Sequence, residues 1–136
     1  MAFLLHESAT GHVPSWEWLP TTAATYVTGD ACVYSSGNLV IVSANVGQDT
    51  DEGTHYICMG SEVVTTTGKL APFIRCTPDL VWRTTLSAAD ADLAVGLKYC
   101  IHTDGRQHDG TTAKGCFTCT RFDGVAKGDY VYGTIV

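Results

Sequence analysis

The chain has 136 residues, a formal net charge of -6 and a pI near 5.1, which is the length of a single domain. Charged residues make up only 16% of it, against roughly 25% in typical domains, and Lys and Arg form no cluster. Because a nucleic-acid partner requires a basic surface, the composition argues against DNA or RNA. Neither a membrane-span run nor a signal-peptide pattern is present, so we expect folding in a reducing cytosol without a membrane partner.

Residues 1–22 differ in composition from the rest of the chain. Pro14 and Pro20 flank the sequence Ser-Trp-Glu-Trp-Leu and favour an extended segment over a helix. Trp16 and Trp18 are two residues apart and would point to one side of an extended chain. We interpret 1–22 as an extended arm that lies on another surface, either a partner or the chain's own domain at 23–136. Its candidate partner-binding residues are the large apolar ones: Phe3, Leu4, Leu5, Trp16, Trp18 and Leu19.

The remaining sequence predicts strands separated by turns. The strand-like segments are 25–33, 38–44, 55–59, 70–76, 80–86, 96–103, 115–122 and 130–136, with a polar loop at 46–53. Gly29-Asp30 and Gly128-Asp129 each stand directly before a strand, and such turn-into-strand units recur in small barrels. Ser87 as a cap, with Asp90 three residues later, predicts one short helix at Ser87–Leu93. The fold class is therefore all-β, a small barrel or sandwich with one short helix.

Six cysteines are spread through the chain: Cys32, Cys58, Cys76, Cys100, Cys116 and Cys119. Only the last two form a CxxC pair, and one such pair does not define a structural zinc site. Residues three apart in a regular strand face opposite sides, so these two would diverge unless a bulge intervened. We expect the cysteines to be small buried hydrophobic residues, with neither structural zinc nor an obligatory disulfide.

One loop gathers polar residues that could hold a divalent metal ion: His102, Asp104, His108 and Asp109. The Asp-Gly pairs at 104–105 and 109–110 also supply ordinary turn geometry, and we favour that interpretation.

Other motifs do not define an active site. His6-Glu7 with His12 lacks the HExxH spacing, Gly60 to Lys69 is too long for a phosphate-binding loop, and no Gly-x-Ser-x-Gly elbow occurs. We therefore predict no enzyme activity, no catalytic residue, no cofactor and no metal.

From residue 24 onward, the order of sequence phrases resembles the capsid decoration (cement) proteins of tailed bacteriophages. The phrases are Gly-Asp-Ala with a hairpin (29–42), Tyr-Ile-Cys-Met (56–59), Gly-Lys followed by Pro-x-Ile-Arg (68–75), Thr-Leu-Ser-Ala with Leu-x-Val-Gly (85–96), a Thr-Asp-Gly turn (103–105) and a closing Gly-Asp-x-Val strand (128–131). The chain departs from the family in its many cysteines.

The resemblance implies a β-barrel or β-tulip-like decoration domain at 23–136, commonly assembled as a homo-trimer. Such a protein is made in the host cytoplasm, binds the major capsid protein on the outer surface of the virion, and stabilises the shell without catalysis. Two other functions stay open at this point. One is a virion-attached host-recognition module, and the other is a small β-barrel metal-binding protein or enzyme that uses the loop at 102–109.

Overall fold

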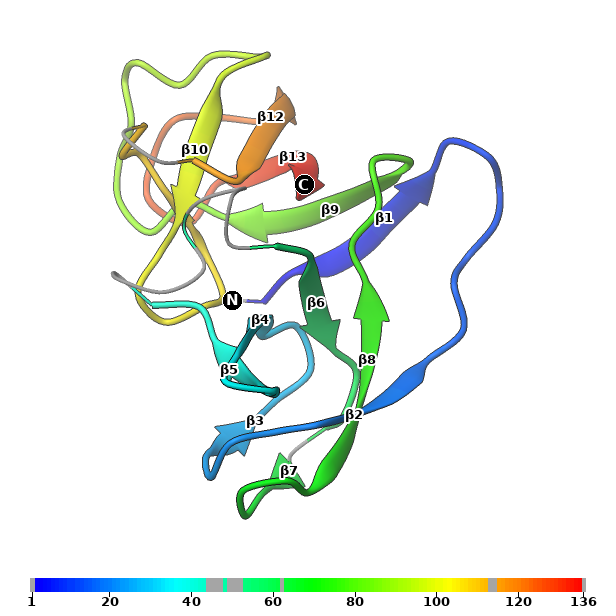
Figure 1. Cartoon of the computed structure of the whole chain (residues 1–136). Coiled ribbons are helices and arrows are strands. Elements are labelled where there is room, and N and C mark those ends of the chain that lie inside the picture. Colours follow the sequence, from blue (N-terminus) through cyan, green and yellow to red (C-terminus); the bar gives the residue numbers. More distant parts are fainter. Residues whose placement is uncertain (1, 44–47, 49–52, 62, 113–114, 136) are drawn as a thin grey trace.

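The structure, a computed structural model, describes residues 2–43, 48, 53–61, 63–112 and 115–135 (Figure 1). Most of the predicted polar loop at 46–53 lies outside the described residues. Thirteen strands occur within the described part: β1 Leu4–Ser8, β2 Glu17–Pro20, β3 Thr25–Tyr26, β4 Ala31–Ser35, β5 Asn38–Ile41, β6 His55–Cys58, β7 Val63–Val64, β8 Leu70–Arg75, β9 Leu80–Thr85, β10 Lys98–Ile101, β11 His108–Asp109, β12 Phe117–Phe122 and β13 Tyr130–Ile135. Over these residues no helix is present, and hence none that could cross a membrane.

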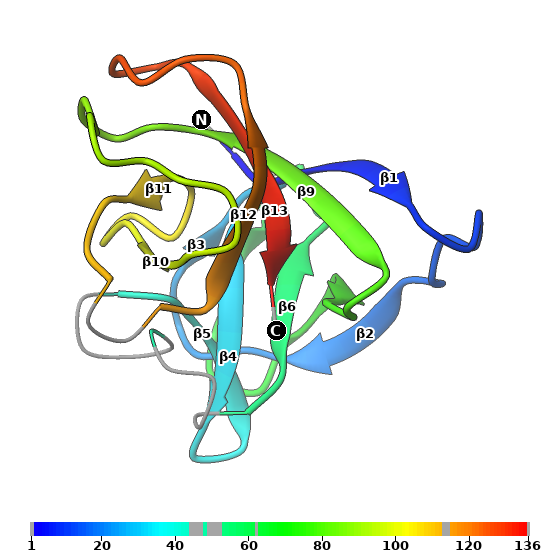
Figure 2. The same ribbon diagram turned by 90° about the horizontal axis from the view of Figure 1, so that it is seen from above.

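The strands form two main antiparallel sheets and a small ribbon. The six-stranded sheet has the order β1-β9-β13-β12-β10-β11, the five-stranded sheet β2-β8-β6-β4-β5, and β3 pairs with β7. Single bridges join Thr21 to Leu39 and Leu86 to His108, so each sheet curls back toward its own far edge (Figures 1 and 2). The all-β class is confirmed, while the described strands form sheets that do not close into a barrel.

Two hydrophobic clusters use opposite faces of the five-stranded sheet. Ile57 and Ile74 belong to the larger cluster, which fills the space between the two main sheets. Tyr56 and Phe73, their neighbours along the same strands, belong to the smaller cluster with Tyr26 of the β3–β7 ribbon. Because both faces are covered, β6 is buried along its whole length and β8 at its four central residues. These two strands therefore hold the layers together.

The predicted helix at Ser87–Leu93 is wrong, because this segment is a series of turns. Several of its backbone groups bond to other parts of the chain, and the bond from Leu93 N–H to Asp90 O at 3.2 Å closes a single turn. Asp90 donates its N–H to Val125 O at 2.9 Å, and Ser87 donates to His108 O at 3.0 Å. The carbonyl of Leu86, which would accept from Asp90 in a helix, accepts from Gly128 at 2.9 Å. Tertiary hydrogen bonds thus replace the short helix, which has little stability of its own.

The two Gly-Asp units have the same local structure, as predicted. Gly29 and Gly128 have φ angles of 93° and 86°, which residues with a side chain rarely adopt. Each following aspartate accepts a hydrogen bond through Oδ2 from the backbone N–H three residues earlier, at 2.9 Å for Asp30 and 3.0 Å for Asp129. Strands β4 and β13 begin at the next residue.

Asp30 has a second role, because its carboxylate is fully buried. Its Oδ1 lies 2.5 Å from Nε of Arg106, in the loop between β10 and β11. Beside this ion pair, Ala31 donates its N–H to Gly105 O at 2.8 Å. A Cβ on Gly105 would lie 2.5 Å from a methyl carbon of Ile41, so only glycine allows this approach. The pair therefore ties a loop of the six-stranded sheet to β4 in the five-stranded sheet.

We predict that Arg106→Leu destabilises the protein by about 3 kcal/mol, because it leaves the buried Asp30 carboxylate without its cation. Urea unfolding followed by circular dichroism measures this change. Arg121→Leu is the control, since Arg121 pairs with Asp123 at the surface, and exposed pairs contribute only about 0–1 kcal/mol. Equal effects of the two substitutions would contradict the role given to the Asp30–Arg106 pair.

Candidate functional site

Residues 1–22 are part of both sheets. The segments at 4–8 and 17–20 are extended, as predicted, but β1 pairs with β9 and β2 pairs with β8. Each is the outermost strand of its sheet, and the chain between them crosses from one sheet to the other (Figures 1 and 2). The segment therefore lies along the edges of the chain's own sheets and does not stand apart from 23–136.

The six candidate partner-binding residues differ in exposure. Phe3 is 1% exposed and its ring packs 5.6 Å from that of Phe117. Its assignment to partner binding is therefore wrong, because it belongs to the core between the sheets. Leu5 and Leu19 are partly buried against the two clusters. Leu4, Trp16 and Trp18 are exposed, and the two tryptophans most of all, at 53% and 62%.

The exposed tryptophans continue a face that forms the core elsewhere. Trp18 lies opposite Pro72, and Pro20 lies opposite Leu70, so these side chains share one face of the β2–β8 pair. Further along the same face of β8, Ile74 packs into the core between the sheets. Leu70, by contrast, is 53% exposed. We call Trp18, Pro20 and Leu70, together with the exposed Trp16 that directly precedes β2, the tryptophan surface. The described part of the six-stranded sheet does not cover this apolar surface.

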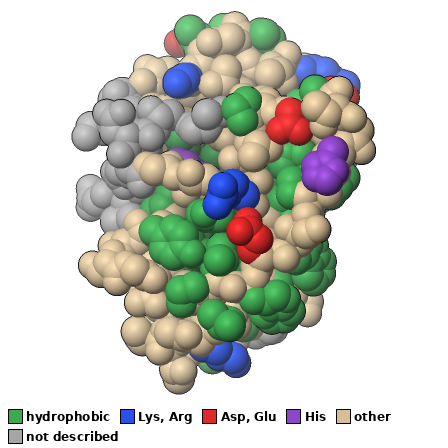
Figure 3. All heavy atoms as spheres, turned by 45° about the vertical axis from the view of Figure 1, so that its right-hand side comes forward, with side chains coloured by type: hydrophobic (Ala, Val, Ile, Leu, Met, Phe, Trp, Pro, Cys, Tyr) green, Lys and Arg blue, Asp and Glu red, His purple; other side chains and the backbone are tan. Residues whose placement is uncertain are grey.

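The nearest charged groups lie on the other face of the β2–β8 pair, because Glu17 pairs with Phe73 and Arg75 pairs with Tyr56. Glu17 and Arg75 approach each other to 4.0 Å, and the Arg75 guanidinium lies 5.8 Å from the centre of the Tyr56 ring. Figure 3 shows that hydrophobic side chains are numerous on the face seen there, with a basic and an acidic side chain among them. Large exposed aromatic groups are typical of the residues that contribute most to protein–protein binding. The arrangement is suited to binding a macromolecule.

The loop at 102–109 forms turns instead of a converging set of ligands. Oδ1 of Asp104 accepts from the Arg106 N–H at 2.8 Å, and Oδ1 of Asp109 accepts from the Thr111 N–H at 2.9 Å. These bonds confirm the turn interpretation. His102 reaches Asp109 at 3.4 Å, whereas the His108 ring packs inside against Tyr99. Among the described residues, no three His, Cys, Asp or Glu side chains gather where they could hold a metal ion.

All six cysteines are buried, as predicted. Cys116 and Cys119 both belong to the core between the sheets. Burial is the largest cause that raises the pKa of Cys32, Cys58, Cys76 and Cys119. Because the thiolate is the form that attacks electrophiles and binds metals, these cysteines behave as core residues.

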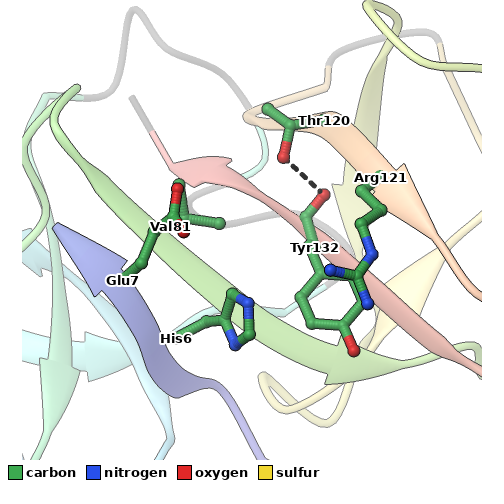
Figure 4. Close-up of a pocket in the computed structure, with 6 residues that line it drawn as sticks. All are labelled: His6, Glu7, Val81, Thr120, Arg121 and Tyr132. Atoms are coloured by element: carbon green, nitrogen blue, oxygen red, sulfur yellow. Dashed lines mark hydrogen bonds between the residues drawn. The ribbon is translucent and has the colours of Figure 1, made fainter. Parts of the chain in front are cut away.

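A pocket of about 290 Å³ opens on the outer face of the six-stranded sheet (Figure 4). It is lined by His6, Glu7, Val81, Thr120, Arg121 and Tyr132. Sequence reasoning missed this site, since it considered His6 and Glu7 only as part of a protease motif. These residues come together only through the register in which their strands pair, and no local sequence motif indicates that register.

No protein-family model matches the chain, and a search of curated proteins finds no match. The two surfaces described above are therefore interpreted from their own geometry and chemistry.

We predict that acid destabilises the protein through His108. Burial lowers the pKa of His108 to about 4, despite the nearby carboxylates of Asp90 and Asp109. The unfolded chain, in which the pKa is near 6.5, binds the proton first, so stability falls as the pH drops from 6.5 to 4 and this contribution levels off below 4. The full loss is about 3 kcal/mol.

Urea unfolding at several pH values measures this loss. His108→Gln should remove that part of the pH dependence, whereas His12→Gln, at an exposed position, should leave it unchanged. A wild-type slope retained in His108→Gln would show that other groups cause the acid sensitivity.

Proposed function

We propose that this protein binds the outside of a bacteriophage capsid and stabilises the shell by bridging major capsid subunits. The observation that carries the proposal is the tryptophan surface, an apolar surface with two exposed tryptophans that no described part of the chain covers. The order of sequence phrases from residue 24 onward supports the same function. A β-tulip-like relation to capsid decoration proteins and assembly as a homo-trimer are part of this proposal.

The fold has the physical properties that a capsid-stabilising protein requires. A brace must transmit force between subunits, and two cores on either side of β6 and β8 make a stiff unit. It must also bind the capsid non-covalently, and the tryptophan surface provides apolar area for that contact. Fully burying a large aromatic side chain contributes roughly 2–3 kcal/mol, so two of them can anchor a contact. Repetition of the contact over many copies on one head adds avidity.

The low charge of the chain also suits a position between other proteins. Only 16% of residues are charged, and the cores of protein interfaces are depleted in charged residues. The tryptophan surface itself consists of Trp, Pro and Leu side chains, so it adds no charge of its own that would oppose docking.

We predict that the double variant Trp16→Ala/Trp18→Ala loses binding to capsids by more than tenfold, because the main apolar contact is removed. Cosedimentation with empty heads built from the major capsid protein of the same genome measures binding. The melting temperature should change little, since both side chains are largely exposed.

The matched control is Val95→Ala/Leu97→Ala, which removes two exposed apolar side chains, 61% and 49% exposed, outside the tryptophan surface. This control should bind heads like the wild type. If the tryptophan variant is folded and cosediments like the wild type, the tryptophan surface is not the docking site.

A further inference from the structure

The pocket on the six-stranded sheet is created by two β-bulges. The pairing of β1 with β9 passes from Leu5–Trp82 to Glu7–Val81, so His6 is an extra residue. The pairing of β12 with β13 passes from Cys119–Gly133 to Arg121–Tyr132, so Thr120 is also extra. Bulges redirect side chains and occur often beside functional sites. Here each bulge brings two consecutive exposed residues to the pocket, His6 with Glu7 and Thr120 with Arg121.

His6 with Glu7 forms one wall of the pocket, and Thr120 with Arg121 forms the opposite wall. Val81 and Tyr132 form the floor between these two walls. Val81 pairs with Glu7, and Tyr132 pairs with Arg121. Tyr132 and Val81 lie on the same face, because Tyr132 pairs with Arg83, two residues beyond Val81. The pocket is thus built from four neighbouring strands, β1, β9, β13 and β12, which makes its floor rigid.

The Arg121 guanidinium is held in place before any ligand arrives. It lies 4.3 Å from the centre of the Tyr132 ring and donates to Asp123 Oδ1 at 3.1 Å. Tyr132 donates to the other oxygen of the same carboxylate at 2.9 Å, and the His6 ring lies 4.6 Å from the Tyr132 ring (Figure 4). These bonds lower the pKa of Asp123, which therefore stays ionised and keeps Arg121 oriented. Arg121 has five N–H donors, and Asp123 accepts from one of its terminal nitrogens.

The groups that remain available define the ligand. The unused N–H groups of Arg121 are suited to a carboxylate, which arginine recognises with two parallel hydrogen bonds. Glu7 contributes a carboxylate that can only accept hydrogen bonds, so it requires donors such as hydroxyls. A single small molecule that satisfies both walls carries a carboxylate and several hydroxyl groups. The volume of about 290 Å³ is just below the range for ligand sites, roughly 300–1,000 Å³, and suits a ligand as small as one sugar ring.

We propose that this pocket binds a hexuronate, the carboxylated sugar unit of acidic polysaccharides. Arg121 binds the carboxylate, Glu7 accepts from ring hydroxyls, and His6 and Thr120 border the ring. Arg83, which stacks 4.5 Å from the centre of the Tyr130 ring, adds a second positive charge on the same face. This face thus holds two of the four arginines in a chain of net charge -6. The activity goes beyond capsid stabilisation and uses a different sheet from the tryptophan surface.

The test is an NMR titration of the isotope-labelled full-length protein with galacturonate, galactose and acetate. Galacturonate should shift the signals of pocket residues with saturable binding. Galactose and acetate should bind at least tenfold more weakly, because galactose lacks the carboxylate for Arg121 and acetate lacks the hydroxyl groups for Glu7. An oligogalacturonate should bind at least as tightly as the monomer, as expected if a polymer is the natural source of the sugar.

Two arginine variants make the test specific. Arg121→Gln should weaken galacturonate binding at least tenfold, and Arg75→Gln should leave it unchanged, because Arg75 also stacks on a tyrosine but lies on the other sheet. Both arginines are more than half exposed, and a thermal melt confirms folding. The proposal is overturned if galacturonate does not shift the pocket signals, if acetate binds equally well, or if Arg121→Gln binds like the wild type. Capsid cosedimentation of Arg121→Gln should be unaffected, so this result is independent of the docking proposal.

Discussion

The buried ion pair between Asp30 and Arg106 is the contact on which the relation between the two sheets depends. The Asp30 carboxylate has no exposure to water, and it accepts from both the Val27 N–H and the Arg106 side chain. A carboxylate in such a place is tolerated only when it is paired and hydrogen-bonded. Its partner comes from 76 residues away in the sequence, so the two sheets must be packed before the charge is satisfied. The pair therefore favours one arrangement of the layers over others that bury similar apolar area.

Several features were predictable because they depend on local sequence alone. The Gly-Asp turns are an example, since glycine permits the positive φ angle and the next side chain caps the turn within four residues. The extended conformation at 17–20 likewise follows from a segment bounded by Pro14 and Pro20. The predictions that failed concern segments whose structure depends on contacts with residues far away in the sequence. The segment at 87–93 has a helical start signal, but Val125 and His108 bond its backbone groups in another arrangement. Phe3 is adjacent to exposed residues in the sequence, and only the packing against Phe117 shows that it is core.

The pocket shows why a site on a sheet surface is difficult to infer from one sequence. His6 and Thr120 become extra residues only through the register of their strands with β9 and β13. No residue type marks a bulge of this kind, and the lining residues come from four separated segments of the chain. Once the register is known, the chemistry is clear: a cation held by Tyr132 and Asp123 faces an acceptor on the opposite wall. The molecule thus has two distinct surfaces, an apolar one at β2 and β8 and a polar one across β1, β9, β13 and β12.

The arrangement of these surfaces suits a protein that holds to a shell by one sheet and presents the other to the medium. The most direct measurement is a cryo-electron microscopy reconstruction of heads assembled from the major capsid protein and decorated with the full-length chain. The account predicts that Trp16 and Trp18 are buried against capsid subunits, and that the pocket around Arg121 faces outward and remains open. Decoration through the six-stranded sheet, with the two tryptophans exposed, would contradict it, as would heads that carry no density for this protein under saturating conditions.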